Sequence, residues 1–187
     1  VGMWLGVLVA VESLVAAGKD VPVQLAADEQ WQSKTVTLLD FSDGTGNCNG
    51  NSGTNRVVRG TVPKGKYQGL AFDISVPFAE NHQDPTRAPA PLNVTGMTWP
   101  WRIGYKFIGI DIETSGGKPG PNAATGFSVH LGSTECGEGS PRTAPSAACT
   151  NPNRPALRFD KFNVKSGRVV LDLAALLDLA HQVLIQL

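Results

Sequence analysis

Glycine and proline interrupt this sequence so often that a long helix is excluded over most of the chain. The chain has 187 residues, with Gly 21 and Pro 13 among them. Short runs rich in Val, Ile, Thr and aromatic residues lie between these turn formers, which is the pattern of short strands. A chain of this length is expected to form a single domain over residues 1–187. We therefore predict an all-β, antiparallel β-sandwich-like fold with long loops.

The strands can be placed by their apolar runs. Two such runs around a polar turn predict a hairpin of Val7–Val15 and Val21–Leu25. Further strands are predicted at Lys34–Phe41, Arg56–Val62, Lys66–Val76, Ile103–Glu113, Phe127–Leu131 and Ala156–Phe162. Val169–Leu187 has no Gly or Pro and is rich in Leu and Ala, so a short C-terminal helix is expected there.

The first residues, Val1–Ala17, are apolar enough to raise the question of membrane insertion. They contain Glu12 and Ser13 and fall short of the ~20 apolar residues that cross a bilayer, so we expect buried strands and no membrane span. Without a Met or a signal pattern at its start, the chain is interpreted as a processed or truncated product. Basic and acidic residues number 16 each, with no dense basic run, so nucleic acid is not an expected partner.

A functional loop is predicted within Gly69–Ile108, where a Pro-rich and Ala-rich crossing joins two strands. His82 follows the strand that Pro77 ends, and strand exits commonly present functional side chains. Trp99 and Trp101 lie at the other end of the crossing. A lone histidine is more often structural, and two tryptophans can simply close the end of a β-sandwich.

The three cysteines allow one disulfide and leave one thiol over. Cys136 and Cys149 flank a loop rich in Gly, Ser, Pro and Ala, which suits a loop-closing disulfide worth about 3 kcal/mol. Two free thiols are the alternative. Cys48 remains without an assigned partner.

Oxygen ligands gather in the Gly-rich and Asn-rich loop that begins near Asp40. Asp40 and Asp43, with several Asn residues after them, offer the hard oxygens that calcium prefers. No glutamate closes the loop as in an EF-hand. A solvated turn is the favoured interpretation, and a calcium loop the weaker one.

Two of the three histidines form the chemically interesting pair. His130 lies in a predicted strand beside a Gly-rich loop, as His82 lies beside the Pro-rich crossing, whereas His181 falls in the predicted helix and is interpreted as a packing or surface residue. Two imidazoles favour copper or zinc, with copper the tighter. A hydrolytic zinc site needs a third ligand and a general base, which the spacing does not supply.

The ordered motifs resemble those of a known family. FDISVPF..NH, APAPLN, GM.W.W, GYKF, VHLGSTEC, C..PNRP and VVLDLAALL occur in this order over nearly the whole chain. They are similar to the MbnP family of copper-linked proteins, which are encoded beside a MauG-like di-haem peroxidase partner of the MbnH type and are related to MopE and CorA of methane oxidisers.

The resemblance implies a location, a metal and a modification. It implies export to the periplasm or cell surface, copper held by His82 and His130, and a tryptophan, Trp99 or Trp101, that the di-haem partner oxidises to kynurenine. The chain departs from its relatives in two ways. Glu80 occupies the position that corresponds to the modified tryptophan of MopE, and the family has four cysteines, so that a partner of Cys48 is expected upstream of Val1.

We therefore expect an exported copper-binding protein that serves in copper acquisition or handling and is not an enzyme. The alternative from another class is an exported structural or adhesive β-domain with no metal role. A small copper oxidase comes third, because the sequence offers no convincing third ligand or acid–base pair.

Overall fold

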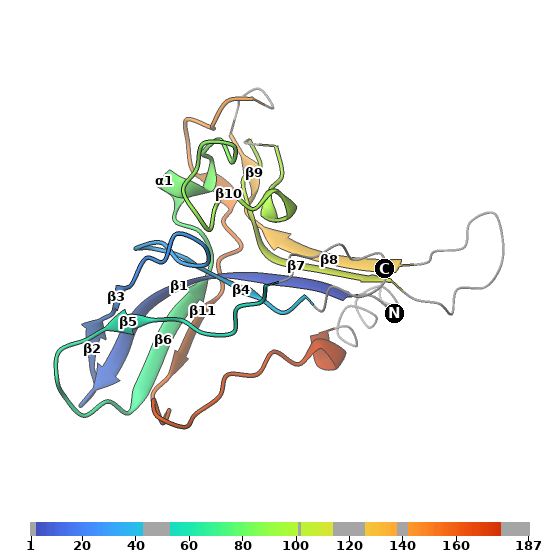
Figure 1. Ribbon diagram of the computed structural model, residues 1–187. Helices are drawn as coiled ribbons and strands as arrows, with labels where there is room; N and C mark the ends of the chain where they lie inside the picture. Colours follow the sequence, from blue (N-terminus) through green and yellow to red (C-terminus); the bar gives the residue numbers. More distant parts are fainter. Residues whose placement is uncertain (1–2, 43–52, 101, 114–125, 138–141, 177–187) are drawn as a thin grey trace.

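The computed structural model describes residues 3–42, 53–100, 102–113, 126–137 and 142–176, and strands dominate them (Figure 1). All strand pairings are antiparallel, which confirms the predicted all-β class. The elements are β1 (Met3–Ala16), β2 (Lys19–Pro22), β3 (Gln24–Leu25), β4 (Thr37–Asp40), β5 (Gly60–Thr61), β6 (Gly69–Ile74), α1 (Phe78–Asn81), the 3₁₀ helix η1 (Thr95–Met97), β7 (Lys106–Glu113), β8 (Gly126–Gly132), β9 (Thr134–Cys136), β10 (Cys149–Asn151) and β11 (Ala156–Phe159).

The long strand β1 organises the main sheet, whose order is β11-β6-β1-β7-β8. Its first half pairs with β4 and β7, and its second half pairs with β2 and β6. The register against β6 shifts between Val11 and Ser13, so Glu12 is the extra residue of a β-bulge. A bulge increases the local bend and twist of a strand. β1 therefore runs through both halves of the sheet, and the two halves point in different directions.

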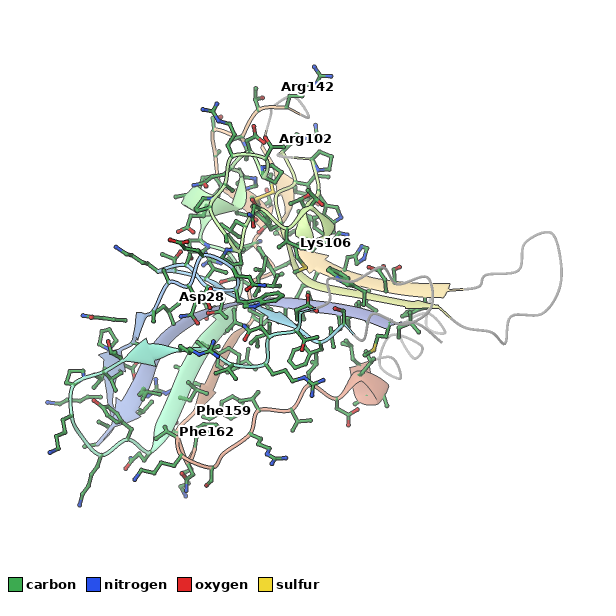
Figure 2. The ribbon with its side chains drawn as sticks, in the orientation of Figure 1. Asp28, Arg102, Lys106, Arg142, Phe159 and Phe162 are labelled. Atoms are coloured by element: carbon green, nitrogen blue, oxygen red, sulfur yellow. A yellow bond between two sulfur atoms is a disulfide. The ribbon has the colours of Figure 1, made fainter. Side chains whose placement is uncertain are left out.

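Both faces of this sheet are covered, because side chains alternate along each strand. One face carries the residues of the first core cluster, Leu8, Val36, Leu38, Val76, Leu92, Met97, Tyr105 and Phe107. The other face carries Val7, Val9, Phe72, Ile108 and Ile110. The Pro-rich crossing supplies Leu92 and Met97 to the first cluster. Phe159 packs on the second cluster, and Figure 2 shows it next to Phe162 in the lower part of the molecule.

The predicted hairpin at the N-terminal end is present, although β1 is longer than expected. Ala17 and Gly18 form its turn with φ of 49° and 76°. Positive φ at both central residues is typical of a type I′ turn, whose twist matches that of the two strands. The predicted strands at Lys34–Phe41 and Arg56–Val62 shorten to β4 and β5.

The C-terminal helix begins later than predicted. Residues 173–176 are helical, whereas Val169 and Val170 are 47% and 79% exposed and lie outside the helix. Asp172 accepts the Ala175 N–H through its carboxylate at 3.0 Å, as a helix N-cap does. The β-branched valines before this cap are weak helix formers. In the part of the chain described here, no helix has the length and apolar character needed to cross a membrane.

Candidate functional site

His82 lies where the chain leaves β6. Pro77 cannot donate to a strand ladder, and it ends the strand pattern as predicted; the four-residue helix α1 follows, and His82 is its C-cap. The helix places Asn81 and His82 in the interior, where they are 2% and 6% exposed. A buried imidazole and a buried amide require hydrogen-bond partners.

Asn81 fixes the orientation and protonation of His82. Its Oδ1 accepts the backbone N–H of Tyr105 at 2.8 Å, so its Nδ2 is the atom that faces His82 Nε2 at 3.3 Å. An amide NH₂ can only donate. Nε2 of His82 is therefore the acceptor and bears a lone pair, and the proton of the neutral ring lies on Nδ1.

The predicted disulfide between Cys136 and Cys149 is present, and it lies beside His82. The two cysteines face one another across the β9–β10 pair and are joined with an S–S distance of 2.06 Å. Cys149 Sγ is 3.6 Å from His82 Nε2. On the other side, the Phe78 ring meets the His82 ring edge to face at 5.0 Å between centroids.

His130 lies on β8, on the face of the sheet opposite its neighbours Val129 and Leu131, which contact the second core cluster. Its Nε2 is 3.0 Å from Oδ1 of Asp111 on the adjacent strand β7. The His130 side chain is 26% exposed. A ligating histidine commonly bonds a carboxylate through one ring nitrogen and the metal through the other. This arrangement leaves Nδ1 of His130 for a metal.

Trp99 is seated against His130. The ring centroids are 6.3 Å apart, and the rings meet edge to face. The backbone N–H of Trp99 bonds the Gly104 carbonyl at 2.9 Å. A Cβ on Gly132 would lie 2.4 Å from Cζ3 of Trp99, so only glycine gives the indole room at this position. Trp99 also lines a small crevice with Asn81 and Gln83, the two neighbours of His82 in the chain.

A second indole covers the glycines next to this site. A Cβ on Gly109 would lie 2.5 Å from Cζ3 of Trp4 and 3.6 Å from Sδ of Met97. Gly109 is paired across the sheet with His130. On the face of the sheet that carries His130, glycines therefore leave room for the side chains of Trp4, Trp99 and Met97 to pack against the backbone.

Tyr105 holds the Pro-rich crossing against the sheet. Its phenol donates to the Leu92 carbonyl at 2.7 Å. Burial, with the nearby carboxylates of Asp84 and Glu80, raises the pKa of Tyr105 to about 12. The phenol therefore stays protonated and keeps its donor role over the physiological range.

The structure places the predicted site residues in two groups. His130 and Trp99 lie together with Asp111, whereas His82 lies with the disulfide. Trp99 connects the groups, because it contacts the His130 ring and lines the crevice beside His82. The alternative tryptophan, Trp101, falls outside the described residues, as do Asp43, Cys48 and His181.

Asp40, the described half of the predicted calcium loop, is engaged within the protein. Its Oδ1 accepts from the backbone N–H and the hydroxyl of Ser42 at 2.8 and 2.6 Å. Its backbone pairs with Asn55. These bonds are those of a buried turn, and the calcium loop stays a prediction.

Sequence reasoning missed Asp111 and Asn81, which orient the two imidazoles. Asp111 could have been found, because it is a carboxylate within the most regular predicted strand, IGIDIE. Asn81 gave only the signal of its position next to His82. The packing of Trp99 on Gly132 depends on a contact between β8 and the crossing that no local pattern encodes.

Comparisons with known proteins agree with this architecture. The model of the MbnP family matches residues 14–186, and no curated protein matches the chain. The structure is similar to that of MbnP from Methylosinus trichosporium, with a TM-score of 0.79 and 34% sequence identity, over 94% of this chain and 65% of that chain. This chain therefore spans less than two thirds of that protein. From the family match and the structural similarity together, the chain belongs to the MbnP family.

Proposed function

We propose that this protein is an exported copper-binding protein of copper acquisition or handling, with His82 and His130 as its imidazole ligands and no turnover of its own. The observation that carries the proposal is the position of Trp99. Its indole lies 6.3 Å from the His130 ring and lines the crevice formed by the neighbours of His82. An oxidisable indole beside His130, in a crevice that the chain neighbours of His82 also line, supports the proposal.

The donor set fits copper. His82 carries its lone pair on Nε2, because the Asn81 amide donates to that atom. His130 has one nitrogen beside the Asp111 carboxylate, which makes the ring a stronger donor through the other. Neutral imidazoles suit copper well. Copper bound here would supply a redox-active cation, and the protein's own groups would fix the ring orientations.

Trp99 is the residue that we propose is oxidised to kynurenine by a MauG-like di-haem partner. The side chain is only partly buried, so an electron can leave it toward a docked partner. The indole ring opens with a net gain of one oxygen, one carbon leaves as formate, and the di-haem partner takes up the four electrons that are released. The aniline nitrogen and ketone of the product can both approach a metal. Coexpression with the partner, followed by intact-mass measurement and peptide mapping, tests this assignment. Modification at Trp101 alone would contradict it.

Titration with Cu(II) tests the ligand assignment. His82→Ala and His130→Ala are each expected to weaken binding by at least about tenfold, since loss of even a supporting residue costs 10–100-fold. His181→Ala is the matched control, because it removes the third imidazole of the chain, which is not a proposed ligand. Equal affinity in all four proteins would overturn the assignment and favour a structural β-domain.

A further inference from the structure

A second group of potential metal ligands lies around His82. His82, Cys136 and Cys149 each offer one ligand atom, and these three atoms all lie within 4.8 Å of one another. His82 and Cys136 are each 6% exposed, and Cys149 is partly buried. The group is therefore compact and largely shielded from water.

The state of the sulfurs decides whether this group can bind a metal. The thiolate is the form of cysteine that ligates metals, and the two sulfurs are bonded to one another in the disulfide. His82 is already suitable, because its Nε2 bears the lone pair and faces Cys149 Sγ at 3.6 Å. Only the disulfide bond separates the group from a two-sulfur, one-nitrogen ligand set.

We propose that reduction of the Cys136–Cys149 disulfide creates a second site, for monovalent copper, with two thiolates and His82 Nε2 as ligands; it shares His82 with the proposed Cu(II) site. Soft thiolate ligands select Cu(I), and a cation of low charge suits a buried pocket. The proposed site uses no atom of His130 or Trp99. The oxidised protein would thus present imidazole ligands for Cu(II), and the reduced protein would present thiolates for Cu(I).

The chemistry balances with a dithiol as the reductant. The dithiol supplies two electrons and two protons, the S–S bond breaks, and the reductant leaves as a disulfide. Each cysteine thiol then loses one proton when it binds the cation. Copper enters as Cu(I) and keeps this oxidation state. His82 loses no proton, because Nε2 is unprotonated beforehand.

The surroundings give access to one of the sulfurs. An open pocket of about 430 Å³ is lined by Arg102, Ile103, Thr134, Glu135, Cys136 and Gly137. Figure 2 shows Arg102 at the end of the molecule that carries β9 and β10. The Ile103 carbonyl, 3.8 Å from Cys136 Sγ, can accept from the reduced thiol.

A titration of the full chain carrying Cys48→Ser tests the proposal, because only the Cys136 and Cys149 thiols are then released on reduction. The protein, reduced by dithiothreitol and freed of it without oxygen, is titrated with Cu(I) against a coloured chelator. It is expected to bind one Cu(I) more than the oxidised protein. Bound copper should protect both thiols from alkylation and give a thiolate-to-copper charge-transfer absorption.

Variants separate this site from the imidazole site. Cys149→Ser is expected to abolish the additional Cu(I), and His82→Ala to weaken it by about tenfold or more. His130→Ala is the matched control, which should leave Cu(I) binding by the reduced protein unchanged while it weakens Cu(II) binding by the oxidised protein. His82→Ala affects both proposed sites, whereas His130→Ala and Cys149→Ser each affect one, so failure of the one proposal is distinguishable from failure of the other.

Three results would overturn the reduced site. One is a reduced protein that stays folded by circular dichroism and takes up no additional Cu(I). Another is a reduced protein that loses its fold and does not regain it with copper. The third is uptake that His130→Ala removes and Cys149→Ser does not.

Discussion

His82 and His130 are the same residue type, yet the fold gives them opposite surroundings. His82 is 6% exposed and faces a neutral amide and a disulfide. The His130 side chain is 26% exposed and faces the Asp111 carboxylate and the Trp99 ring. Burial and the Asn81 contact hold the His82 ring in one orientation. Partial exposure gives access to the His130 ring, and the Asp111 carboxylate orients it. The first arrangement suits a permanently oriented ligand, and the second suits a ligand at which metal can enter.

The largest effect is expected when Gly132, which packs against Trp99, is replaced by a larger residue. A Cβ at position 132 would also lie 2.5 Å from the Tyr105 carbonyl oxygen, which is backbone and cannot rotate away. Gly132→Val is expected to cost about 2–3 kcal/mol of unfolding free energy by overpacking and to weaken Cu(II) binding, both measured on the same protein. Gly96→Ala is the control, because its Cβ would meet Trp4 at an ordinary 3.4 Å. Equal losses in the two variants would show that Trp99 can relocate.

Asn81→Ala should disturb the His82 side of the comparison. It leaves the buried Tyr105 N–H without its acceptor, which costs about 1–3 kcal/mol in urea unfolding. Asn81→Asp keeps that acceptor but cannot donate to Nε2, so it should alter the histidine tautomer, observed by nitrogen NMR, more than stability. Asn93→Ala, at an exposed position of the crossing, is the control. A Nε2-protonated His82 in the wild-type protein would contradict the tautomer inferred above.

Asp111→Asn should disturb the His130 side alone. Loss of the carboxylate is expected to weaken Cu(II) binding by about 10–100-fold. The unfolding free energy should change by less than about 1 kcal/mol, because the ion pair is partly exposed. Asp73→Asn on β6, separated from β8 by β1 and β7, is the control. An unchanged copper affinity would show that His130 needs no support from Asp111.

The smallest effect is expected from a change in the loop that contains Asp28 and contacts α1. Burial acts to raise the pKa of Asp28, but N–H donation from Trp31, Gln30 and Gln32 outweighs it and, with Arg59, lowers the pKa below 3.8. The carboxylate therefore stabilises the fold above pH 3.8, and this contribution is lost as the pH falls through the lower folded pKa.

Asp28→Asn should reduce stability at neutral pH by less than about 1 kcal/mol, with the difference from wild type shrinking in acid. Denaturant unfolding across the acid range measures it. Thr35 of the same loop donates to Glu80 of α1 at 2.8 Å, so a spectroscopic change should appear at His82 before His130. A difference that grows in acid would reverse the expected sign.

The sequence predicted the strands better than it predicted their contacts. Alternation and turn residues located β1, β6, β7 and β8, because these features act within a few residues. The disulfide followed from loop composition and spacing. The start of the C-terminal helix was wrong, because an apolar stretch outweighed the cap at Asp172 in the prediction. The separation of His82 from the group around His130 depends on how β9 and β10 pack, which is long-range information.

The sharing of β1 by both halves of the sheet has a consequence for how the chain reaches its native state. β1 pairs with β2 directly after it in the sequence, but also with β7, which ends at Glu113. Pairing across so large a separation requires the closure of long loops, and such topologies fold slowly. We therefore expect both halves to melt together, because neither keeps its central strand when the other is lost. Local loosening should be confined to the loops and to α1.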